Sequence, residues 1–600
     1  MNKLLKMSAI NDVENDEPEK KEKLVNEDSK ESSSIKIKLL YIGTIIFVLL
    51  VVVSVALLVI WKGGKNKKNT DIKNDEEEED LDDCIYINVT HYITAKYSVL
   101  PAENEWVEGG DRVIHLFNEK YLDSISSLII DSEKVKPSNQ YFLKVGIHEV
   151  TVEFNTSLKS TDQMFQDSTE LIELDFSQFI TENLTNMTAM FSGCTSLTSL
   201  NLTNFDTSKV RNMSYLFNEC SIIENIIIDN NFNTSKVSDM KYMFSGCIKI
   251  TSLNLAAFDT RKVKEMKYMF ANCQKLPTIE FGDNFIIKGI KDLSGIFRDC
   301  LSLKAINLKN IDTSQTVNLS NMFSNCVKLT SIDLSKFDTS KVTDMNSMFY
   351  NCFVLTSIDL SSFDTSNVED MHNIFATCSS VKELNLKKFK TSKVKNMRAM
   401  FNRCTALESL DLSNFDTSQV EDMNEMFDYC NSIKALDLSK FDTSKVTDMS
   451  YMFAACTKLT SINLKSFNTK NVIQLQYMFY NDMSLSSIDL SSFNTSKVNN
   501  IANMFQGCQA MTEINLSNFD TSKVTSMIGI FAECSSLVKI DISKFTSQTL
   551  NNESYYFFTG KCSNGTVKVN SKLFDKEFID EIFENWEIID LNPNIRNFIL

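Results

Sequence analysis

The chain has 600 residues, a formal net charge of −17 at pH 7 and 43% hydrophobic residues. Such an acidic chain lacks the basic surface that nucleic-acid binding requires, so we expect no nucleic-acid partner. It contains only four histidines and no zinc-protease, serine-hydrolase, P-loop or dinucleotide-binding motif. We therefore expect a protein that is not an enzyme, with no catalytic, cofactor-binding or metal-binding residues and no cofactor.

The N-terminal part of the chain predicts a membrane anchor. Residues 1–38 are rich in Lys, Glu, Asp and Asn without apolar periodicity, which predicts a disordered polar tail. Leu39–Trp61 follows as 23 residues without a charge, long enough to span a bilayer. It begins too late and runs too long for an ordinary cleaved signal peptide. The sequence thus predicts one transmembrane helix, with the lipid bilayer as its partner.

Two further regions precede the main body of the chain. Residues 62–83 start with lysines and continue with a run of acids, which predicts an extended charged spacer. Residues 84–160 have mixed strand patterns and are expected to form an N-terminal cap. Val150, Val152 and Phe154 alternate with polar residues, which predicts the first strand of this cap.

Residues 161–550 repeat with a period of 26 residues, lengthened to 27 in two places. A fixed period of this length predicts a solenoid, in which each rung buries its apolar face by stacking on its neighbours. About fifteen rungs are expected, and residues 551–600 break the repeat as a C-terminal cap. One phenylalanine per rung marks the period: Phe165, Phe191, Phe217, Phe244, Phe270, Phe297, Phe323, Phe349, Phe375, Phe401, Phe427, Phe453, Phe479, Phe505 and Phe531.

Each rung has two apolar patterns. Met449, Met452, Phe453 and Cys456 fall at i, i+3, i+4 and i+7, which predicts one face of a helix of about two turns. Thr447 or Asp448 is placed to cap the start of this helix. The pattern then changes to period two around Ile462 and Leu464, as in a short strand, and an Asp-Thr-Ser turn follows. The predicted fold is an α/β solenoid with a leucine-rich-repeat-like parallel sheet and one short helix per rung.

The repeat resembles that of the BspA-type leucine-rich-repeat surface proteins, the 26-residue "bacterial surface protein" repeat. The segments Asp344–Cys352 and Ser357–Ser366 reproduce its Met-x-x-Met-Phe-x-x-Cys and Leu-Ser-x-Phe-Asp-Thr-Ser elements nearly residue for residue. The resemblance covers about residues 160–550. It implies a surface protein linked to adhesion and no catalytic residue.

Thirteen cysteines occur three residues after a marker phenylalanine, one per rung. We interpret them as a column of small buried hydrophobic residues. Disulfides between rungs and a metal array are the alternatives, and the second lacks a His or second Cys beside each thiol. The thirteen are Cys194, Cys220, Cys247, Cys273, Cys300, Cys326, Cys352, Cys378, Cys404, Cys430, Cys456, Cys508 and Cys534.

One outward strand position is acidic or amidic in successive rungs, and we take it as a candidate binding face. It could meet basic protein surfaces, hydroxyl-rich glycans or divalent cations. The alternative is a solvated polar face that keeps the solenoid soluble, and the scarcity of aromatic and Arg anchors favours this. The residues are Asp333, Asp359, Asn385, Asp411, Asp437, Asn463, Asp489, Asn515 and Asp541.

These observations give one leading functional hypothesis and two alternatives. The first is a single-pass cell-membrane protein whose extracellular solenoid mediates adhesion to, or recognition of, a protein or glycan. Twelve Asn-x-Ser/Thr sequons, all after the predicted span, favour this orientation, whereas the lysines just after the span oppose it. A structural coat protein without a specific ligand and a membrane-tethered intracellular scaffold are the alternatives.

Overall fold

The computed structural model describes residues 91–101, 112–229, 231–546, 565–573, 583 and 586–591. All of them belong to one structural unit, residues 88–600. The predicted polar tail, transmembrane helix Leu39–Trp61 and charged spacer lie outside the described residues. Within the described ranges, no helix has the length and apolar character needed to cross a membrane.

An antiparallel sheet covers the N-terminal end of the unit. Its strand order is β4-β3-β6-β1-β7, and a separate pair joins β2 to β5. Val150, Val152 and Phe154 of β6 are buried as the alternation predicted, but β6 is a central strand of the sheet and five strands precede it. The elements are β1 (Tyr92–Val99), β2 (Arg112–His115), the 3-10 helix η1 (Glu119–Ser124), β3 (Ile125–Ile130), β4 (Glu133–Val135), β5 (Gln140–Leu143) and β6 (Gly146–Phe154).

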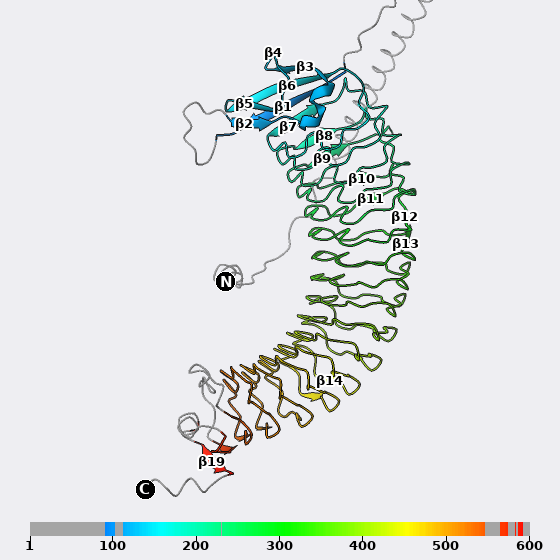
Figure 1. Ribbon diagram of the computed structural model, residues 1–600. Coiled ribbons are helices and arrows are strands. Elements are labelled where there is room, and N and C mark those ends of the chain that lie inside the picture. Colours follow the sequence, from blue (N-terminus) through cyan, green and yellow to red (C-terminus); the bar gives the residue numbers. More distant parts are fainter. Residues whose placement is uncertain are drawn as a thin grey trace, which may run out of the picture. The chain divides into compact units, whose positions relative to one another are not determined.

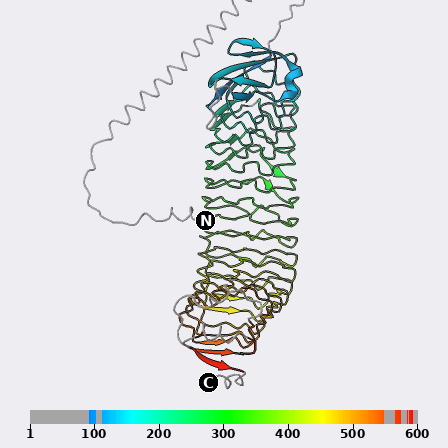
Figure 2. The same cartoon turned by 60° about the vertical axis from the view of Figure 1, so that its left-hand side comes forward.

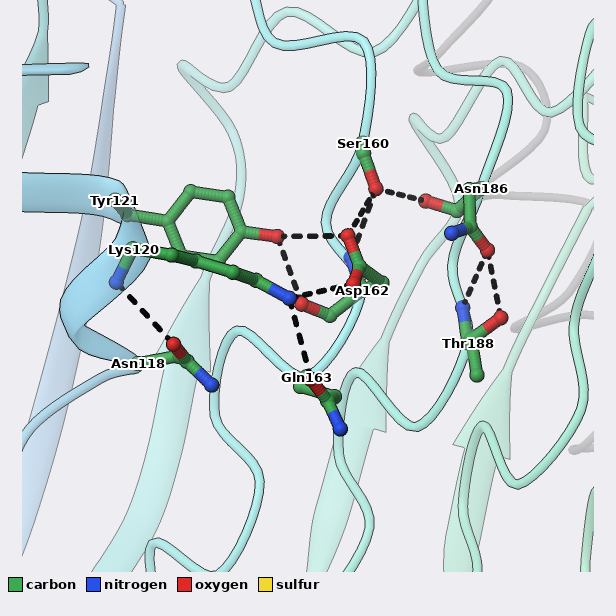
Figure 3. A network of polar contacts seen from close by, with 8 residues as sticks. All are labelled: Asn118, Lys120, Tyr121, Ser160, Asp162, Gln163, Asn186 and Thr188. Carbon is green, nitrogen blue, oxygen red and sulfur yellow. Dashed lines mark hydrogen bonds and ion pairs between the residues drawn. The ribbon is translucent and has the colours of Figure 1, made fainter. Parts of the chain in front are cut away.

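The cap joins the solenoid through backbone pairing and a polar network. Strand β7 (Leu171–Asp175) belongs to the first rung and pairs antiparallel with β1. Beside it, the Lys120 ammonium lies 2.5 Å from a carboxylate oxygen of Asp162, and the Tyr121 hydroxyl donates to the Asp162 carbonyl oxygen at 2.8 Å (Figure 3). These contacts cover the apolar end of the first rung, as the terminal rung of a solenoid requires.

The repeats form a parallel solenoid in which successive rungs stack on one another (Figures 1 and 2). The strands are short and pair only over parts of the array, so the predicted sheet is not continuous. Among the described residues between β13 and β14, no further strand forms. The strands are β8 (Ser199–Asn201), β9 (Asn225–Ile227), β10 (Asn254–Leu255), β11 (Glu280–Phe281), β12 (Ile287–Lys288), β13 (Ile311–Asp312), β14 (Ala435–Asp437), β15 (Ser461–Asn463), β16 (Glu513–Asn515), β17 (Lys539–Asp541), β18 (Thr566–Val569) and β19 (Glu587–Asp590).

The predicted helix in each rung is wrong, because the Met-x-x-Met-Phe-x-x-Cys segment forms successive turns. The N–H groups of Met449 and Phe453 donate to carbonyl oxygens of the next rung, on Gln474 and Met478, at 3.1 and 3.0 Å. Between them, the Tyr451 N–H also donates to the next rung, to Gln476 at 3.1 Å, whereas the Met452 N–H closes a four-residue turn onto the Met449 carbonyl oxygen at 3.2 Å. Half of the amides thus leave the segment, so a helix cannot form.

Left-handed residues make these turns possible. Tyr451 and Ala455 have φ values of 59° and 56°, and the equivalent residues of other rungs share them. Positive φ at the third residue is the requirement of a type II turn, which glycine and asparagine meet most easily. Asp448, one of the two expected capping residues, accepts the Ser450 N–H at 2.8 Å and so starts a turn instead of a helix.

The apolar columns lie where the repeat predicted them. The marker phenylalanine rings are buried and stacked, with Phe401 centred 6.0 Å from Phe375 and 5.6 Å from Phe427. The cysteines are buried and unbridged. Each thiol donates to the carbonyl oxygen of the marker phenylalanine of the preceding rung, as Cys456 does to Phe427 at 3.2 Å. This bond explains why a thiol, and not only a small apolar group, recurs at the position.

We expect the cysteine thiols to react slowly in the native protein. Burial raises the pKa of the thiols from Cys194 to Cys508, for example that of Cys378 to about 12, so almost no thiolate forms there at neutral pH. Counting thiols with a labelling reagent checks this. Denaturation without reductant should expose at least thirteen that the native protein conceals, and a denatured count near zero would mean cross-linked rungs.

The Asp-Thr-Ser turn holds a second column, which we call the threonine ladder. The buried Thr443 hydroxyl donates to the carbonyl oxygen of Asn468 in the next rung at 3.2 Å and accepts the N–H of the same residue at 2.8 Å. Other rungs repeat the arrangement, as with Thr391 and Asp416. The sequence predicted only local turn bonds here, whereas the threonine connects two rungs.

Replacing Thr443 with valine should lower the free energy of unfolding by about 1–3 kcal/mol, because the Asn468 N–H and C=O lose their partner in a buried place. A thermal or urea melt measures this. Thr447→Val is the matched control, since the Thr447 side chain is exposed and its only bond, to the Glu421 carbonyl oxygen, is 3.4 Å long. Equal losses in the two variants would contradict the role of the ladder.

Candidate functional site

The predicted binding face consists largely of residues that shape turns. All nine side chains accept the N–H of the residue two positions later, for example Asp333 from Ser335 at 2.9 Å and Asp437 from Ser439 at 3.0 Å. Hydrogen bonding to these serines lowers the pKa of Asp333, and likewise of Asp359, Asp411 and Asp489. The positions are exposed, apart from the half-buried Asp541. Their regular spacing follows from the turn, with or without a ligand.

A column whose residue type changes along the array lies on the surface made by the Met-x-x-Met-Phe-x-x-Cys turn segments, which we call the turn face. Each turn segment has two residues with positive φ, and the first of them forms this column, with one residue per rung. Three consecutive tyrosines stack in it, with ring centroids 4.8 and 5.0 Å apart, and a second stack follows later at 4.6 Å. Between the two stacks the residues are mostly small or amidic. In chain order the column reads Gln163, Ala189, Tyr215, Tyr242, Tyr268, Gly295, Asn321, Ser347, Asn373, Ala399, Glu425, Tyr451, Tyr477, Asn503 and Gly529.

The surface is hollowed where this column lacks tyrosine, and we call the hollow the turn-face groove. It has a volume of about 640 Å³ and runs over six rungs, from Arg298 to Glu425. Asparagines and serines contribute much of its lining, and Tyr350 and His372 contribute the aromatic rings there. Ser347 and Ala399 are almost fully buried at its floor. The groove therefore exists because small side chains occupy positions that carry tyrosine on either side of it.

Ion pairs and amide bonds fix the charged residues of the groove. Arg398 donates to Glu425 at 3.1 Å, and the amide of Asn402 donates to the other Glu425 oxygen at 3.3 Å. The hydrogen bond to Asp370, 2.8 Å long, raises the pKa of His372. Burial raises the pKa of Asp422. These side chains are held in place without a ligand, which lowers the entropic cost of binding one.

The same region departs from the average charge of the repeat. Residues 379–404 contain eight Lys and Arg and a single acid, whereas residues 353–378 contain four acids and residues 405–430 seven, neither with any Lys or Arg. Elsewhere in the array acids and bases are more evenly mixed. Lys390 even replaces the aspartate of the Asp-Thr-Ser turn. One basic rung thus lies between two acidic rungs.

Ion pairs connect these three rungs across the stack. Lys395 lies 2.8 Å from Glu369 and Lys390 3.9 Å from Asp364 in rung 353–378, and Arg398 lies 3.1 Å from Glu425 in rung 405–430. Such exposed pairs contribute little stability each, typically about 0–1 kcal/mol. They favour the observed alignment of neighbouring rungs, because opposite charges in adjacent rungs attract and like charges would repel. A second depression of about 480 Å³ lies beside Lys387, Lys388 and Lys390.

Two buried acids lie just beyond the groove. Burial raises the pKa of Asp428 to about 7, and its carboxylate accepts the Asn402 amide at 3.0 Å. Asp482 occupies the cysteine position of its rung and is fully buried, which raises its pKa well above the usual range. One of its oxygens accepts the Cys456 N–H at 2.9 Å, and the other has no hydrogen-bond partner.

The turn-face groove was not predicted from the sequence, in which the strand column was the candidate binding face. Two signals in the sequence could have found it: the loss of tyrosine between Tyr268 and Tyr451, and the uneven charge per rung. Both become visible only when the rungs are aligned and each column is read along the array. In the parts of the chain that the structure describes, no three His, Cys, Asp or Glu side chains gather as metal ligands would.

The rungs and their turn face define a repeat protein with a parallel solenoid and an elongated surface groove. The chain belongs to the DUF285 family, described as "Mycoplasma protein of unknown function". The family model matches residues 138–227, 198–281, 278–384, 374–487 and 460–571. No curated protein gave a significant sequence match.

Two solved structures are similar to the chain over much of its length. One is a leucine-rich cell surface protein from Faecalibacterium prausnitzii A2-165, with 16% identity over 61% of this chain and 87% of that one and a TM-score of 0.28. The other is a TLR13–ssRNA13 complex, with 15% identity over 68% and 85% and a TM-score of 0.12. Superpositions this poor carry no conclusion about function.

Proposed function

We propose that this chain is a single-pass cell-surface protein whose solenoid recognises a partner outside the cell through the turn-face groove. Support for the anchor comes from the uncharged segment Leu39–Trp61, and support for the surface role comes from the resemblance of the repeat to BspA-type surface proteins. The acidic spacer would hold the solenoid away from the membrane.

The observation that carries the proposal is the local break in periodicity. A coat protein without a specific ligand needs only uniform rungs, whereas recognition requires some rungs to differ from the others. The tyrosine column stops after Tyr268 and resumes at Tyr451, and the interval coincides with the groove. The unevenly charged rungs 353–378, 379–404 and 405–430 lie at the end of this interval.

Protease treatment of intact cells tests the location. If the solenoid lies outside, the protease should release a large fragment that begins within the charged spacer, residues 62–83, because the acid-rich spacer predicts an accessible segment. In a eukaryotic cell that fragment should carry glycans at some of the twelve sequons. A solenoid that is cut only after permeabilisation would support the tethered intracellular scaffold and exclude both surface roles.

A further inference from the structure

We propose that the turn-face groove binds a neutral oligosaccharide chain that lies along the solenoid axis. The inference rests on the proposed recognition function and names the chemical class of its ligand. It is carried by the groove's lining, its shape and its ends, each of which favours a hydroxyl-rich chain over other partners.

The lining offers hydrogen bonds in the form that sugars use. The amides of Asn321 and Asn373 each carry donors and an acceptor, and Ser347 provides a hydroxyl. A sugar hydroxyl also donates and accepts, so it can bond to such a mixed lining without leaving polar groups unpaired. The paired positions of Arg398 and Glu425 present fixed donors and acceptors at one end.

The charge of the lining points to a neutral ligand. Two arginines, Arg298 and Arg398, are balanced by Asp422 and Glu425, and both arginines already have acidic partners, at 3.1 Å in each case. The whole chain is acidic at −17, so it repels a polyanion before contact. A positively charged partner gains little from a lining that is balanced.

The shape fits a chain several units long. Six rungs at a spacing of about 4.8 Å give a groove of roughly 24 Å. Tyrosine stacks lie one rung beyond either end, at Tyr268 and Tyr451. The Tyr268 ring lies over Gly295, where an added Cβ would come within 2.2 Å of it. Tyrosine rings combine an apolar face with a polar hydroxyl, which suits the apolar face of a pyranose ring.

A protein partner fits the groove less well. Stable protein interfaces centre on apolar or aromatic anchors in a desolvated core. Here the lining contributes only Ala399 and the rings of Tyr350 and His372 as apolar or aromatic surface, and its other residues are polar. A protein that covered it would have to desolvate many amides and hydroxyls for little apolar burial.

The test fills the groove with residues that the fold already accepts. We would titrate the purified full-length protein with neutral oligosaccharides of about four to six sugar units, a length chosen to match six rungs. At least one should bind the wild type, and the double variant Ser347→Tyr/Ala399→Tyr should weaken it tenfold or more. Tyrosine stands at this position in five other rungs, so the variant should retain its thermal melt. Asn503→Tyr, in the same column but outside the groove, is the control and should bind normally.

Removal of amides provides a second variant if the filled one is unstable. Asn321→Ser/Asn373→Ser keeps residues that the column accepts, as at Ser347, and should also lower affinity. The inference is overturned if no oligosaccharide binds the wild type, or if neither variant differs from Asn503→Tyr. If cells lose adhesion with the filled groove while no sugar binds, the surface role stands and the glycan inference fails. If sugars bind but protease cannot reach the solenoid on intact cells, the glycan inference stands and the surface role fails.

Discussion

Replacing Phe401 with aspartate is expected to unfold several rungs in the middle of the solenoid. The Phe401 ring is fully buried between Phe375 and Phe427. Loss of a core aromatic side chain costs about 3–5 kcal/mol. Burying an unpaired carboxylate adds several kcal/mol more. Because each rung is stabilised mainly by its neighbours, the damage spreads along the array. Circular dichroism should show a much lower or a split thermal transition.

Phe353→Asp provides the control for this experiment. Phe353 lies only four residues after the marker Phe349, but its side chain is 55% exposed. Its replacement removes the same ring and adds the same charge in water, so the melt should change little. If both variants melted like the wild type, the marker phenylalanines could not form the core that the structure shows.

Replacing Asp482 with cysteine, the residue at this position in thirteen of the other rungs, is expected to stabilise the protein, and the gain in stability should grow as the pH rises. Unfolded, Asp482 should lose its proton near pH 4, whereas burial raises its pKa well above that in the folded state. Well below pH 4 the Asp482 carboxyl is protonated in both states, so its ionisation does not change the free energy of unfolding. As the pH rises, the unfolded state ionises while the folded state keeps its proton, so the free energy of unfolding falls. The fall continues up to the folded pKa.

Urea melts of wild type and Asp482→Cys between pH 4 and pH 8 measure this difference. The advantage of the variant should grow with pH, by about 1.4 kcal/mol per pH unit at most. Asp482→Asn should show the same growth, since it also lacks the titrating group but keeps an acceptor for the Cys456 N–H. The Asp428 carboxyl, with a pKa of about 7, should give a second fall between about pH 4 and pH 7 that Asp428→Asn removes. A constant difference across the range would show that Asp482 does not titrate on unfolding.

The functional surface was harder to predict than the fold, for a physical reason. Consensus residues such as Asp437 draw attention because they recur, but recurrence here reflects a turn that every rung needs. Residues that depart from the consensus, such as Ser347, Ala399 and Lys390, cannot be distinguished from neutral variation when one rung is read alone. Stacked in register, the first two leave a groove and the third interrupts an acidic column between Asp364 and Asp416.

The sequence by itself determined the solenoid, its period and the contents of its core. An apolar residue that recurs every 26 positions can be buried only by stacking, so Phe401 and Cys404 had to lie inside. The tertiary structure decided the conformation of the Met-x-x-Met-Phe-x-x-Cys segment that contains these two residues. Spacing at i, i+3, i+4 and i+7 is compatible with a helix or with successive turns. The neighbouring rung offers carbonyl oxygens to alternate N–H groups, as Met426 does to Phe401 at 3.0 Å, and this partner is absent from any single repeat. The groove likewise depends on the stack, because its floor is assembled from residues 26 positions apart.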